Sequence, residues 1–572
     1  MKFGLGMTVT RLSGLRSRVF GSVFAVAALT VAVIAIASAG PAARSATADA
    51  PTCAAGTTVQ TTSGPVCGIT SSTVSTVNEW LGIPYAAPPV GNLRWQPPQP
   101  PTPWTTTLAA TAFGSECTTT SGTAGSEDCL FVNVWAPSNA TSTSNLPVLV
   151  HIHGGGFTGG NGNSDNSLLA NTGEVIVSMN YRLNIFGFLV NDKALGANSG
   201  DYGLQDQQAA LRWVQNNVAA FGGNPSKVTT FGESAGGSSQ CDLIASPTAA
   251  GLFEQAISVS GEYNTLLGYP TSLEPQDCKS MPPTKAQANA AGKNFAAAAG
   301  CGTGSAAVVA ACLRALPAAT VESIAGGGAT PPHPGGYLNG GQGTVGPTIN
   351  GTTLTMSLRQ ALKTGHVNHV RVIAGTDRDE DLVAYANEAP FPVTTPADYQ
   401  TLVDTQYGAF ASQVLAKYPV TRFDSPGLAW RTVAADSDTV CPSLVTDQDL
   451  ASRMPTYGYE IDDNDIPPYT PAGPGVVAPG ASHVGAWFLN PQATPLDANQ
   501  QVLQDQEIAY VTAFARSGNP STAIGAPAWP RFNLANPQEI SLQPAGDTEV
   551  VSAAQVSAQH NCAFWDRIAP KP

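Results

Sequence analysis

One stretch of the chain, residues 227–237, constrains the fold more than any other: Lys-Val-Thr-Thr-Phe-Gly-Glu-Ser-Ala-Gly-Gly. A short run rich in β-branched residues, 228–231, meets Gly232, and Ser234 and two more glycines follow. The pattern predicts a strand, a sharp turn and a helix, because glycine permits a tight backbone reversal. The turn would present Ser234 at the end of a strand. Because the chain holds 58 glycines, an ordinary glycine-rich turn is the alternative, and the surrounding sequence has to decide between them.

Strands and helices are predicted on both sides of this turn. Runs of apolar and β-branched residues predict strands at 129–135, 146–152, 175–181, 256–260, 371–374 and 457–461, and helical periodicity predicts helices at 206–221, 238–245, 285–318, 399–418 and 500–516. This order predicts an α/β fold with a large, mixed, mostly parallel central sheet and helices on both faces. Residues 51–572 contain no repeat and no dividing linker, so we expect one domain with long loop insertions at 326–343 and 463–482.

The first 50 residues have the pattern of an export signal. Basic residues at positions 2, 11, 16 and 18 precede an uncharged, mostly apolar run at 19–39, and small residues follow. We expect signal cleavage near Ala39 or Ala50 and a secreted, extracellular protein. An uncleaved N-terminal membrane anchor is the alternative, because the apolar run approaches the length that spans a bilayer.

The charge of the chain limits its partners. The 26 Lys and Arg and 40 Asp and Glu give a net charge of −14. The first 50 residues hold five basic and one acidic residue, so the remainder has 21 basic and 39 acidic residues and a net charge of −18. No cluster of Lys and Arg occurs beyond residue 50, which argues against nucleic-acid partners. We expect a soluble monomer with no stable membrane association after signal cleavage.

All ten cysteines lie beyond residue 50, and an even number in an exported chain predicts disulfides. Pairing sequence neighbours is the simplest arrangement, and it joins Cys53 with Cys67, Cys117 with Cys129 and Cys301 with Cys312, leaving Cys241 with Cys278 and Cys441 with Cys562. The sequence alone leaves the connectivity open. No C-x-x-C pair occurs, so we expect no metal and no cofactor.

A serine hydroxyl becomes an effective nucleophile only with a base, a group that orients the base, and donors for the developing oxyanion. Gly154, Gly155 and Gly156 directly follow the apolar strand predicted at 146–152. Glycines there let backbone N–H groups approach a substrate oxygen. The N–H of Ala235, at the start of the helix after Ser234, would be a further donor. The alternative is that the three glycines form only a flexible turn.

Seven histidines are candidates for the base. Hydrolases with this strand-turn-helix motif place the acid after the serine and the histidine after the acid, which favours His483 in the loop at 479–485. His333, His366 and His369 lie before or near the candidate acids, and His560 lies in the cysteine-bearing tail. His151 and His153 belong to the glycine loop, where we expect one to be buried and the other to orient the loop.

An acidic loop follows the strand predicted at 371–374, at the position in chain order where the acid is expected. The candidate acids there are Asp377, Asp379, Glu380 and Asp381. A solvated run of charge is the alternative. The residues alone leave these four candidates open.

Eight motifs together resemble one known family: Gly82-Ile-Pro-Tyr-Ala, Glu127-Asp-Cys-Leu-Phe-Val-Asn-Val, His153-Gly-Gly-Gly-Phe, Asn180-Tyr-Arg-Leu, Gly203-Leu-Gln-Asp-Gln, Phe221-Gly-Gly-Asn-Pro, Gly232-Glu-Ser-Ala-Gly-Gly and Ser517-Gly-Asn-Pro. With them, the chain resembles the type-B carboxylesterase/lipase family, the cholinesterase-like α/β-hydrolases, from about residue 65 to the end. The resemblance implies an α/β-hydrolase fold and a serine hydrolase that cleaves small-molecule carboxylic esters through an acyl-enzyme.

The resemblance also implies the roles of individual residues. It makes Ser234 the nucleophile, Glu380 the acid and His483 the base. The implied oxyanion donors are Gly155, Gly156 and Ala235, and Phe157 is a candidate wall of the substrate pocket. Three of the disulfides are implied as well: Cys117–Cys129, Cys301–Cys312 and Cys441–Cys562. A triacylglycerol lipase acting on lipid esters is the alternative function, and a non-catalytic cholinesterase-like binding protein is a third.

We predict weak or no preference for choline esters. In cholinesterases, the loop that corresponds to Cys117–Cys129 is longer and carries the tryptophan that binds choline. Here the eleven residues between these cysteines include no aromatic residue. A desolvated cation–π contact contributes about 2 kcal/mol. Without it, kcat/KM for a choline ester should exceed that for a neutral ester of the same acyl chain by less than about tenfold. A larger preference in matched kinetics would contradict this prediction.

Overall fold

The computed structural model describes residues 52–119, 125–261, 278, 284–325, 346–380, 393–463 and 496–568. Ala50–Pro572 forms one compact unit. The predicted signal segment and nearly all of the two long loops predicted from the sequence lie outside the described residues. Within the described ranges, no single helix is long and apolar enough to cross a membrane.

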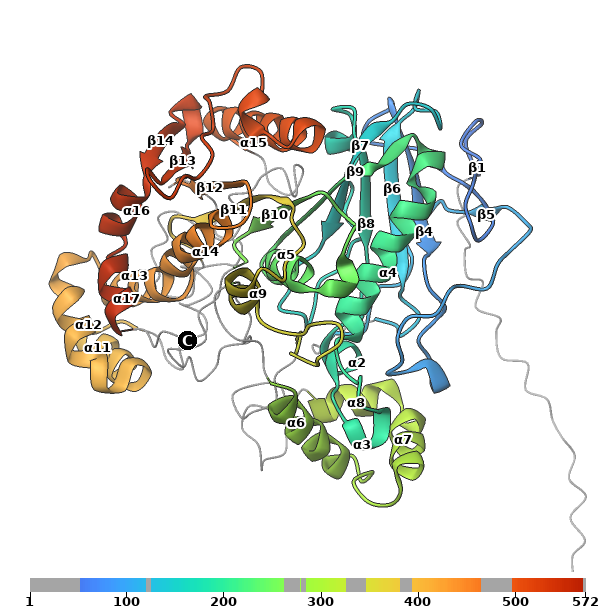
Figure 1. Ribbon diagram of the computed structural model, residues 1–572, viewed down its shortest axis with the longest axis horizontal. Coiled ribbons are helices and arrows are strands. Elements are labelled where there is room, and N and C mark those ends of the chain that lie inside the picture. The colour runs from blue at the N-terminus through green and yellow to red at the C-terminus, as the bar shows by residue number, and fades with distance from the viewer. Residues whose placement is uncertain are drawn as a thin grey trace, which may run out of the picture. The chain divides into compact units, whose positions relative to one another are not determined.

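The described strands form an eleven-stranded sheet in the order β14-β13-β12-β11-β10-β9-β7-β8-β6-β4-β3 (Figure 1). Their bounds are β3 Ile69–Thr70, β4 Val77–Pro84, β6 Phe131–Pro137, β7 Leu146–Ile152, β8 Val175–Met179, β9 Gly223–Glu233, β10 Gln255–Val259, β11 Arg371–Asp377, β12 Thr456–Ile461, β13 Gln538–Leu542 and β14 Glu549–Ser552. In sheet order, every pair from β8 to β13 is parallel, and the pairs at both margins are antiparallel. The predicted mixed, mostly parallel sheet is confirmed. A smaller sheet joins β1 Val59–Gln60, β2 Pro65–Cys67 and β5 Leu108–Ala109.

The central strands bury both of their faces. On β7, Val148 and Val150 belong to one apolar core, whereas Leu149 between them belongs to the core on the other side of the sheet. On β8, Val177 and Ile176 divide in the same way. Successive side chains of a strand point to opposite faces, so a strand covered on both sides is apolar at nearly every position. This explains why the sequence shows unbroken apolar runs here.

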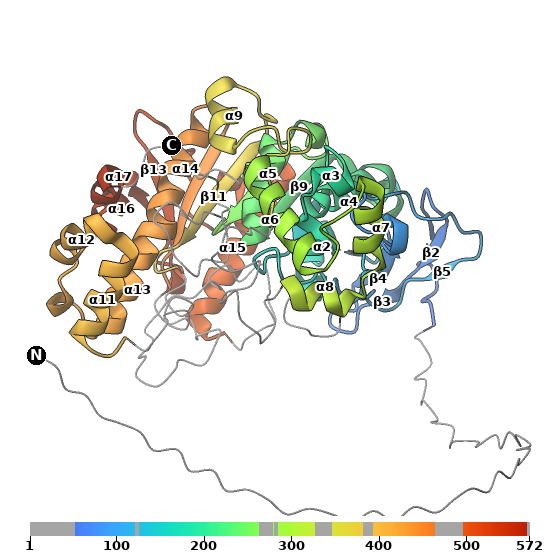
Figure 2. The ribbon, with the colours of Figure 1, turned by 90° about the horizontal axis from the view of Figure 1, so that it is seen from below.

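Helices cover both faces, as the sequence predicts. One face carries α4 Tyr202–Asn217, α5 Ala235–Ala245, α9 Leu358–Thr364 and α14 Cys441–Ala451, and the other carries α1 Ser167–Ala170 and α15 Ala498–Ser517. Figure 2 shows α15 on the side of the sheet opposite α5 and α14. The other described helices pack around two further apolar cores. They are α2 Asn184–Phe188, α3 Asp192–Leu195, α6 Lys285–Ala298, α7 Ala306–Ala315 and α8 Ala318–Ala325 in one group, and α11 Pro396–Tyr407, α12 Ala411–Lys417, α13 Pro426–Ala435, α16 Ala553–Gln559 and α17 Cys562–Ile568 in the other.

Two predicted helices are each divided in the structure. The helix predicted at 285–318 is the pair α6 and α7, separated at 299–305, where Gly300 has a left-handed φ of 71°. The helix predicted at 399–418 is the pair α11 and α12, separated at Gly408, whose φ is 48°. Glycine adopts these angles without a steric penalty, so it ends a helix that alanine-rich periodicity would continue. The helical stretch from α13 to α14 and strands β13 and β14 are not predicted from the sequence.

All ten cysteines are paired, and the pairs are those that neighbour pairing gives: Cys53–Cys67, Cys117–Cys129, Cys241–Cys278, Cys301–Cys312 and Cys441–Cys562. Four of them close loops of 37 residues or fewer, whereas Cys441–Cys562 spans 121 positions. The long bridge ties the end of the chain to the helices that pack on the sheet.

We predict that the long disulfide stabilises the fold more than the short ones do. Loop closure in the unfolded chain costs more entropy for a longer loop. Replacing Cys441 and Cys562 by alanine should therefore lower the free energy of unfolding by about 5 kcal/mol, against about 3 kcal/mol for Cys301 and Cys312. Urea denaturation of the two double variants measures the difference. A larger loss from the Cys301–Cys312 pair would contradict the prediction.

Candidate active site

The predicted turn between strand and helix is present, and its backbone is strained. β9 lies between β7 and β10, and α5 begins at Ala235, directly after Ser234. Ser234 has φ 55° and ψ −125°, a conformation that L-residues rarely adopt. Its N–H donates to the Val259 carbonyl oxygen at 2.9 Å, and its own carbonyl oxygen accepts from Ser238 N–H at 2.8 Å. These two bonds hold the serine at the turn between two elements.

Close packing against β7 explains the glycines of the turn. A Cβ atom at Gly232 would lie 2.3 Å from the Ile152 carbonyl oxygen, and one at Gly236 would lie 2.1 Å from the same oxygen. At Gly237, a Cβ would lie 2.6 Å from the carbonyl oxygen of Val259. All three obstacles are backbone atoms, which cannot rotate away. The turn therefore tolerates no side chain at these positions.

The triple-glycine loop after β7 lies against the serine turn. A Cβ at Gly154 would meet the Glu233 carbonyl oxygen at 2.6 Å and the Ser234 Cβ at 3.1 Å. Gly155 and Gly156 have left-handed φ angles of 97° and 62°. Within the described residues, the N–H groups of these two glycines donate to no protein acceptor. The structure thus brings the predicted oxyanion loop and the predicted nucleophile together.

Two histidines next to this loop are neutral packing residues. His153 Nδ1 donates to the Gly154 carbonyl oxygen at 2.8 Å, and its ring stacks on Tyr181 with centroids 4.3 Å apart. Burial lowers the pKa of His153 to about 4. The His151 ring stacks on Phe231 at 5.0 Å, and burial, with the nearby His153, lowers the pKa of His151 to about 3. His153 therefore braces the glycine loop, the orienting role expected of one of the pair.

Phe157, the candidate pocket wall, lies in the core. Its side chain is fully buried, and its ring makes edge contacts with Tyr181 and Phe188 at centroid distances of 6.4 and 5.4 Å. Its φ of 53° follows from the turn that the glycine loop makes. A contact between Phe157 and substrate stays a prediction.

Among the candidate acids, Glu380 has the environment of a fixed, oriented carboxylate. It is fully buried in the turn after β11. One oxygen, Oε2, accepts hydrogen bonds from Ser260 Oγ at 2.5 Å, Thr376 Oγ1 at 3.0 Å and Asp377 N–H at 3.2 Å. Asp379 instead forms an ion pair with Arg378 at 2.6 Å and is partly exposed. Asp381 lies outside the described residues.

Ser260 is a contact of Glu380 that is not predicted from the sequence. It follows β10 with a left-handed φ of 45°, and its N–H donates to the Gly375 carbonyl oxygen of β11 at 2.9 Å. Its neighbour Val259 accepts the hydrogen bond from Ser234. Residues 259–260 therefore connect the turn after β9, which carries the predicted nucleophile, to β11, which precedes the candidate acids. A serine at the end of a predicted strand was the only available signal.

The candidate base, His483, lies outside the described residues, as does His333. β12 leads toward that part of the chain and pairs with β11, the strand that precedes Glu380. Of the alternatives, His366 is exposed and donates to or accepts from Thr364 Oγ1 at 2.9 Å. The described residues contain no group of three or more His, Cys, Asp and Glu side chains that could hold a metal ion.

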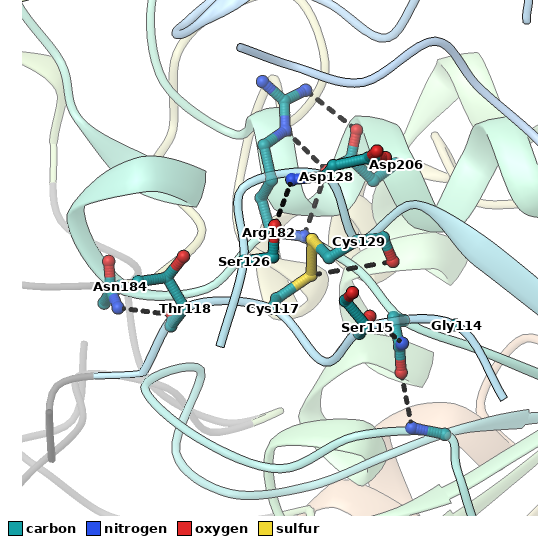
Figure 3. The surroundings of a disulfide bond; sticks show 12 residues. Gly114, Ser115, Cys117, Thr118, Ser126, Asp128, Cys129, Arg182, Asn184 and Asp206 are labelled. Atoms are coloured by element: carbon teal, nitrogen blue, oxygen red, sulfur yellow. Dashed lines mark hydrogen bonds and ion pairs between the residues drawn. A yellow bond between two sulfur atoms is a disulfide. The ribbon is translucent and has the colours of Figure 1, made fainter. Parts of the chain in front are cut away.

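A buried ion pair links two of the motifs near the Cys117–Cys129 disulfide (Figure 3). Arg182 Nε and Nη2 donate to the two carboxylate oxygens of Asp206 at 2.7 and 2.8 Å. The third donor, Arg182 Nη1, bonds the Gln96 carbonyl oxygen at 2.9 Å. The pair joins the loop after β8, helix α4 and the proline-rich segment. Both residues belong to motifs named above, but their pairing is not predicted from the sequence.

Comparisons with known proteins agree with this architecture. A model of the carboxylesterase family matches residues 55–565. The chain is 33% identical to para-nitrobenzyl esterase of Bacillus subtilis strain 168 over 84% of this chain and 95% of that protein. It is 30% identical to carboxylesterase 1D of Rattus norvegicus over 86% of this chain and 89% of that protein. A solved structure of PNB esterase superposes with a TM-score of 0.71 at 29% identity, covering 88% of this chain and 99% of that one.

We predict that Gly236→Ala impairs the site severely. Its Cβ would lie 2.1 Å from the Ile152 carbonyl oxygen, so the turn or β7 must move. Displacement of catalytic groups by about 1 Å costs roughly 100-fold in rate, and kcat/KM for a chromogenic ester should fall at least that far.

The matched control is Gly159→Ala in the neighbouring loop, where the nearest atom to the added Cβ is 3.8 Å away. This variant should retain activity within about threefold, because a contact at that distance forces no movement. Equal losses in both variants would contradict the packing argument.

Proposed function

Because the chain belongs to the carboxylesterase family of α/β-hydrolases, we propose that it hydrolyses carboxylic esters with Ser234 as nucleophile, His483 as base and Glu380 as acid. Ester hydrolysis itself follows from the family. The residue assignment is the proposal, and its main support is the strained turn at Ser234, with φ 55° and ψ −125°. Backbone strain of this kind persists where the surrounding packing enforces it, and it concentrates at functional sites.

The proposed oxyanion hole consists of the N–H groups of Gly155, Gly156 and Ala235. Ala235 is the first residue of α5, so its N–H belongs to the helix N-terminus, where the aligned peptide dipoles favour negative charge. Fixed donors aimed at the developing charge need no reorganisation during the reaction, and one such donor contributes about 3 kcal/mol. The contact between Gly154 and Ser234 supports this arrangement, because it sets the loop beside the nucleophile.

The proposed reaction is a two-step acyl transfer. His483 takes the proton of the Ser234 hydroxyl, whose oxygen attacks the ester carbonyl and forms a tetrahedral oxyanion. The carbonyl re-forms as the alkoxide departs, and His483 donates the proton to the departing alkoxide. The acyl group remains on Ser234 as the acyl-enzyme. Water repeats these steps on the acyl-enzyme and releases the acid. Glu380 orients the imidazole and stabilises its cation. Its three hydrogen-bond donors fix the carboxylate for that role.

We propose small, neutral esters as substrates and a secreted location. The chain is 33% identical to para-nitrobenzyl esterase over 95% of that protein, so para-nitrobenzyl esters are the first substrates to assay. The net charge of −14 disfavours anionic substrates and anionic lipid surfaces. Five disulfides are compatible with an oxidising compartment.

We predict that Ser234→Ala abolishes turnover and that Glu380→Gln lowers it severely, for different reasons. Ser234→Ala removes the nucleophile, so both turnover and labelling by a fluorophosphonate probe should be lost. Glu380→Gln keeps the shape of the side chain but removes its charge, and kcat should fall by about 10,000-fold. Steady-state kinetics and mass spectrometry of the labelled protein measure both effects.

Asp379→Asn is the matched control for the acid. Asp379 neighbours Glu380 in the same turn but pairs with Arg378 at the surface, so its loss should lower kcat by less than about tenfold. If Asp379→Asn were as damaging as Glu380→Gln, the acid would be misassigned. Labelling of Ser234→Ala would mean that another residue is the nucleophile.

A further inference from the structure

A second cluster of buried ionisable groups lies next to the turn that carries Glu380. It consists of His560, Asp436, Glu460, Glu539 and Tyr418, and we call it the His560 cluster. All five side chains belong to residues that are at most 5% exposed. None of them takes part in the proposed acyl transfer. Burying several ionisable groups is costly unless they compensate one another, so this cluster requires an explanation.

His560 is held by contacts on both ring nitrogens. Nδ1 donates to Asp436 Oδ1 at 2.7 Å, and Nε2 lies 3.4 Å from Glu460 Oε2. The other oxygen of Asp436 accepts a hydrogen bond from the Tyr418 hydroxyl at 2.7 Å. The indole of Trp565 donates to that hydroxyl at 2.7 Å. The imidazole therefore bridges a helix-borne carboxylate and a strand-borne carboxylate.

Two local features of the chain create this arrangement. A π-helical turn, Asp436–Val440, interrupts the helical stretch between α13 and α14, and all five of its residues are buried. Such turns hold one extra residue and are frequent at functional sites. The Cys441–Cys562 disulfide starts one residue after this turn and ends two residues after His560, so it ties both sides of the ion pair together.

The strand register places the cluster beside the candidate acid. Thr376 of β11 is paired with Glu460 of β12. Side chains of paired residues in a parallel sheet point to the same face, on strands about 4.8 Å apart. The Thr376 hydroxyl donates to Glu380 Oε2 at 3.0 Å, whereas Glu460 reaches His560. Arg378, in the acid's turn, also forms an ion pair with Asp462 directly after β12.

His560 carries the positive charge of the cluster. The charges of Asp436 and Glu460 outweigh the effect of burial and raise the pKa of His560 to about 10. Burial and the neighbouring Glu460 raise the pKa of Glu539. The groups that face His560 are Asp436 from the π-helical turn, Glu460 from β12, Glu539 from β13 and Tyr418 from the segment after α12. Asp379 of the acid's turn acts on Asp436, whose pKa burial raises.

We propose that His560 is a positioning residue of the active site. With Asp436 and Glu460, it fixes the adjacent ends of β11 and β12, from which Glu380 follows, and it sets the charge next to the catalytic acid. The proposal rests on the proposed function, because it assigns Glu380 to the triad. Its geometric basis is the pairing of Thr376 with Glu460: the Thr376 hydroxyl donates to Glu380, and the Glu460 carboxylate lies 3.4 Å from His560 Nε2. A metal site is a weaker explanation, because the described residues form no group that could hold an ion.

Variants of opposite charge test the proposal. His560→Gln removes a positive charge near the triad, which favours the protonated form of the triad base. The acid limb of the kcat/KM–pH profile should move to higher pH by roughly 0.3 to 1 unit. Removing the strand carboxylates should move it to lower pH by a similar amount. This second variant is Glu460→Gln with Glu539→Gln, because the two buried carboxylates act on each other electrostatically.

Two further variants separate positioning from folding. His560→Lys keeps a cation and should return the limb toward its wild-type position. His366→Gln makes the same chemical change at an exposed histidine and should leave the profile unmoved. All profiles are measured below pH 8 and are normalised to sites that react with the fluorophosphonate probe, so loss of folded protein does not alter them.

Shifts of opposite sign support the proposal. Two outcomes would overturn the proposal and make the cluster purely structural. One is a loss of active sites with no shift of the acid limb, and the other is a shift of the same sign in both variants. If His560→Gln does not fold, the double glutamine variant alone decides by the presence or absence of its shift. Failure of the proposed function is recognised separately, because wild-type protein would then lack a label on Ser234.

Discussion

The contact between the Ile152 carbonyl oxygen and the serine turn is the constraint on which the site depends. Gly232 and Gly236 both pack against that one oxygen, so β7 and the turn after β9 approach more closely than any side chain allows. The strained backbone of Ser234 is a consequence of this approach, because two rigid backbones leave the residue between them no relaxed alternative. The glycine loop, which continues from Ile152, is placed beside Ser234 by the same contact.

The parallel order of the strands turns this local constraint into a site. Strands β9, β10 and β11 are adjacent and parallel, so their carboxyl ends lie at one edge of the sheet. Ser234, Ser260 and Glu380 follow those ends in turn, and hydrogen bonds connect each strand to the next. Ligand sites in open α/β sheets form at this edge, because the loops there are free to carry functional groups while the strands hold them in register.

The sequence predicts this arrangement where the signal is local and misses it where the signal is long-range. The turn at Ser234 and the apolar central strands are predicted because glycine positions and apolar runs report steric and burial requirements directly. The choice of Glu380 among four carboxylates came from family resemblance, since nothing local distinguishes it from Asp379. The contacts of Ser260 and the Arg182–Asp206 pair join segments that are distant in the sequence. No local residue pattern predicts such contacts.

The two halves of the site reach their precision by different physics, and this difference decides how each responds to substitution. The half that carries Ser234, the proposed nucleophile, rests on repulsion between backbone atoms, which rises steeply over a few tenths of an ångström. Adding one methyl group at Gly236 is therefore close to all-or-none. The half that carries Glu380, the proposed acid, rests on hydrogen bonds and charges, whose energies fall gradually with distance. Changes at the residues around Glu380, as opposed to Glu380 itself, should shift the charge state of the site by degrees and leave the site in place. Substitutions that change the pH dependence of the enzyme are therefore expected near the ends of β11 and β12. Substitutions in the serine turn should instead either preserve the site or destroy it.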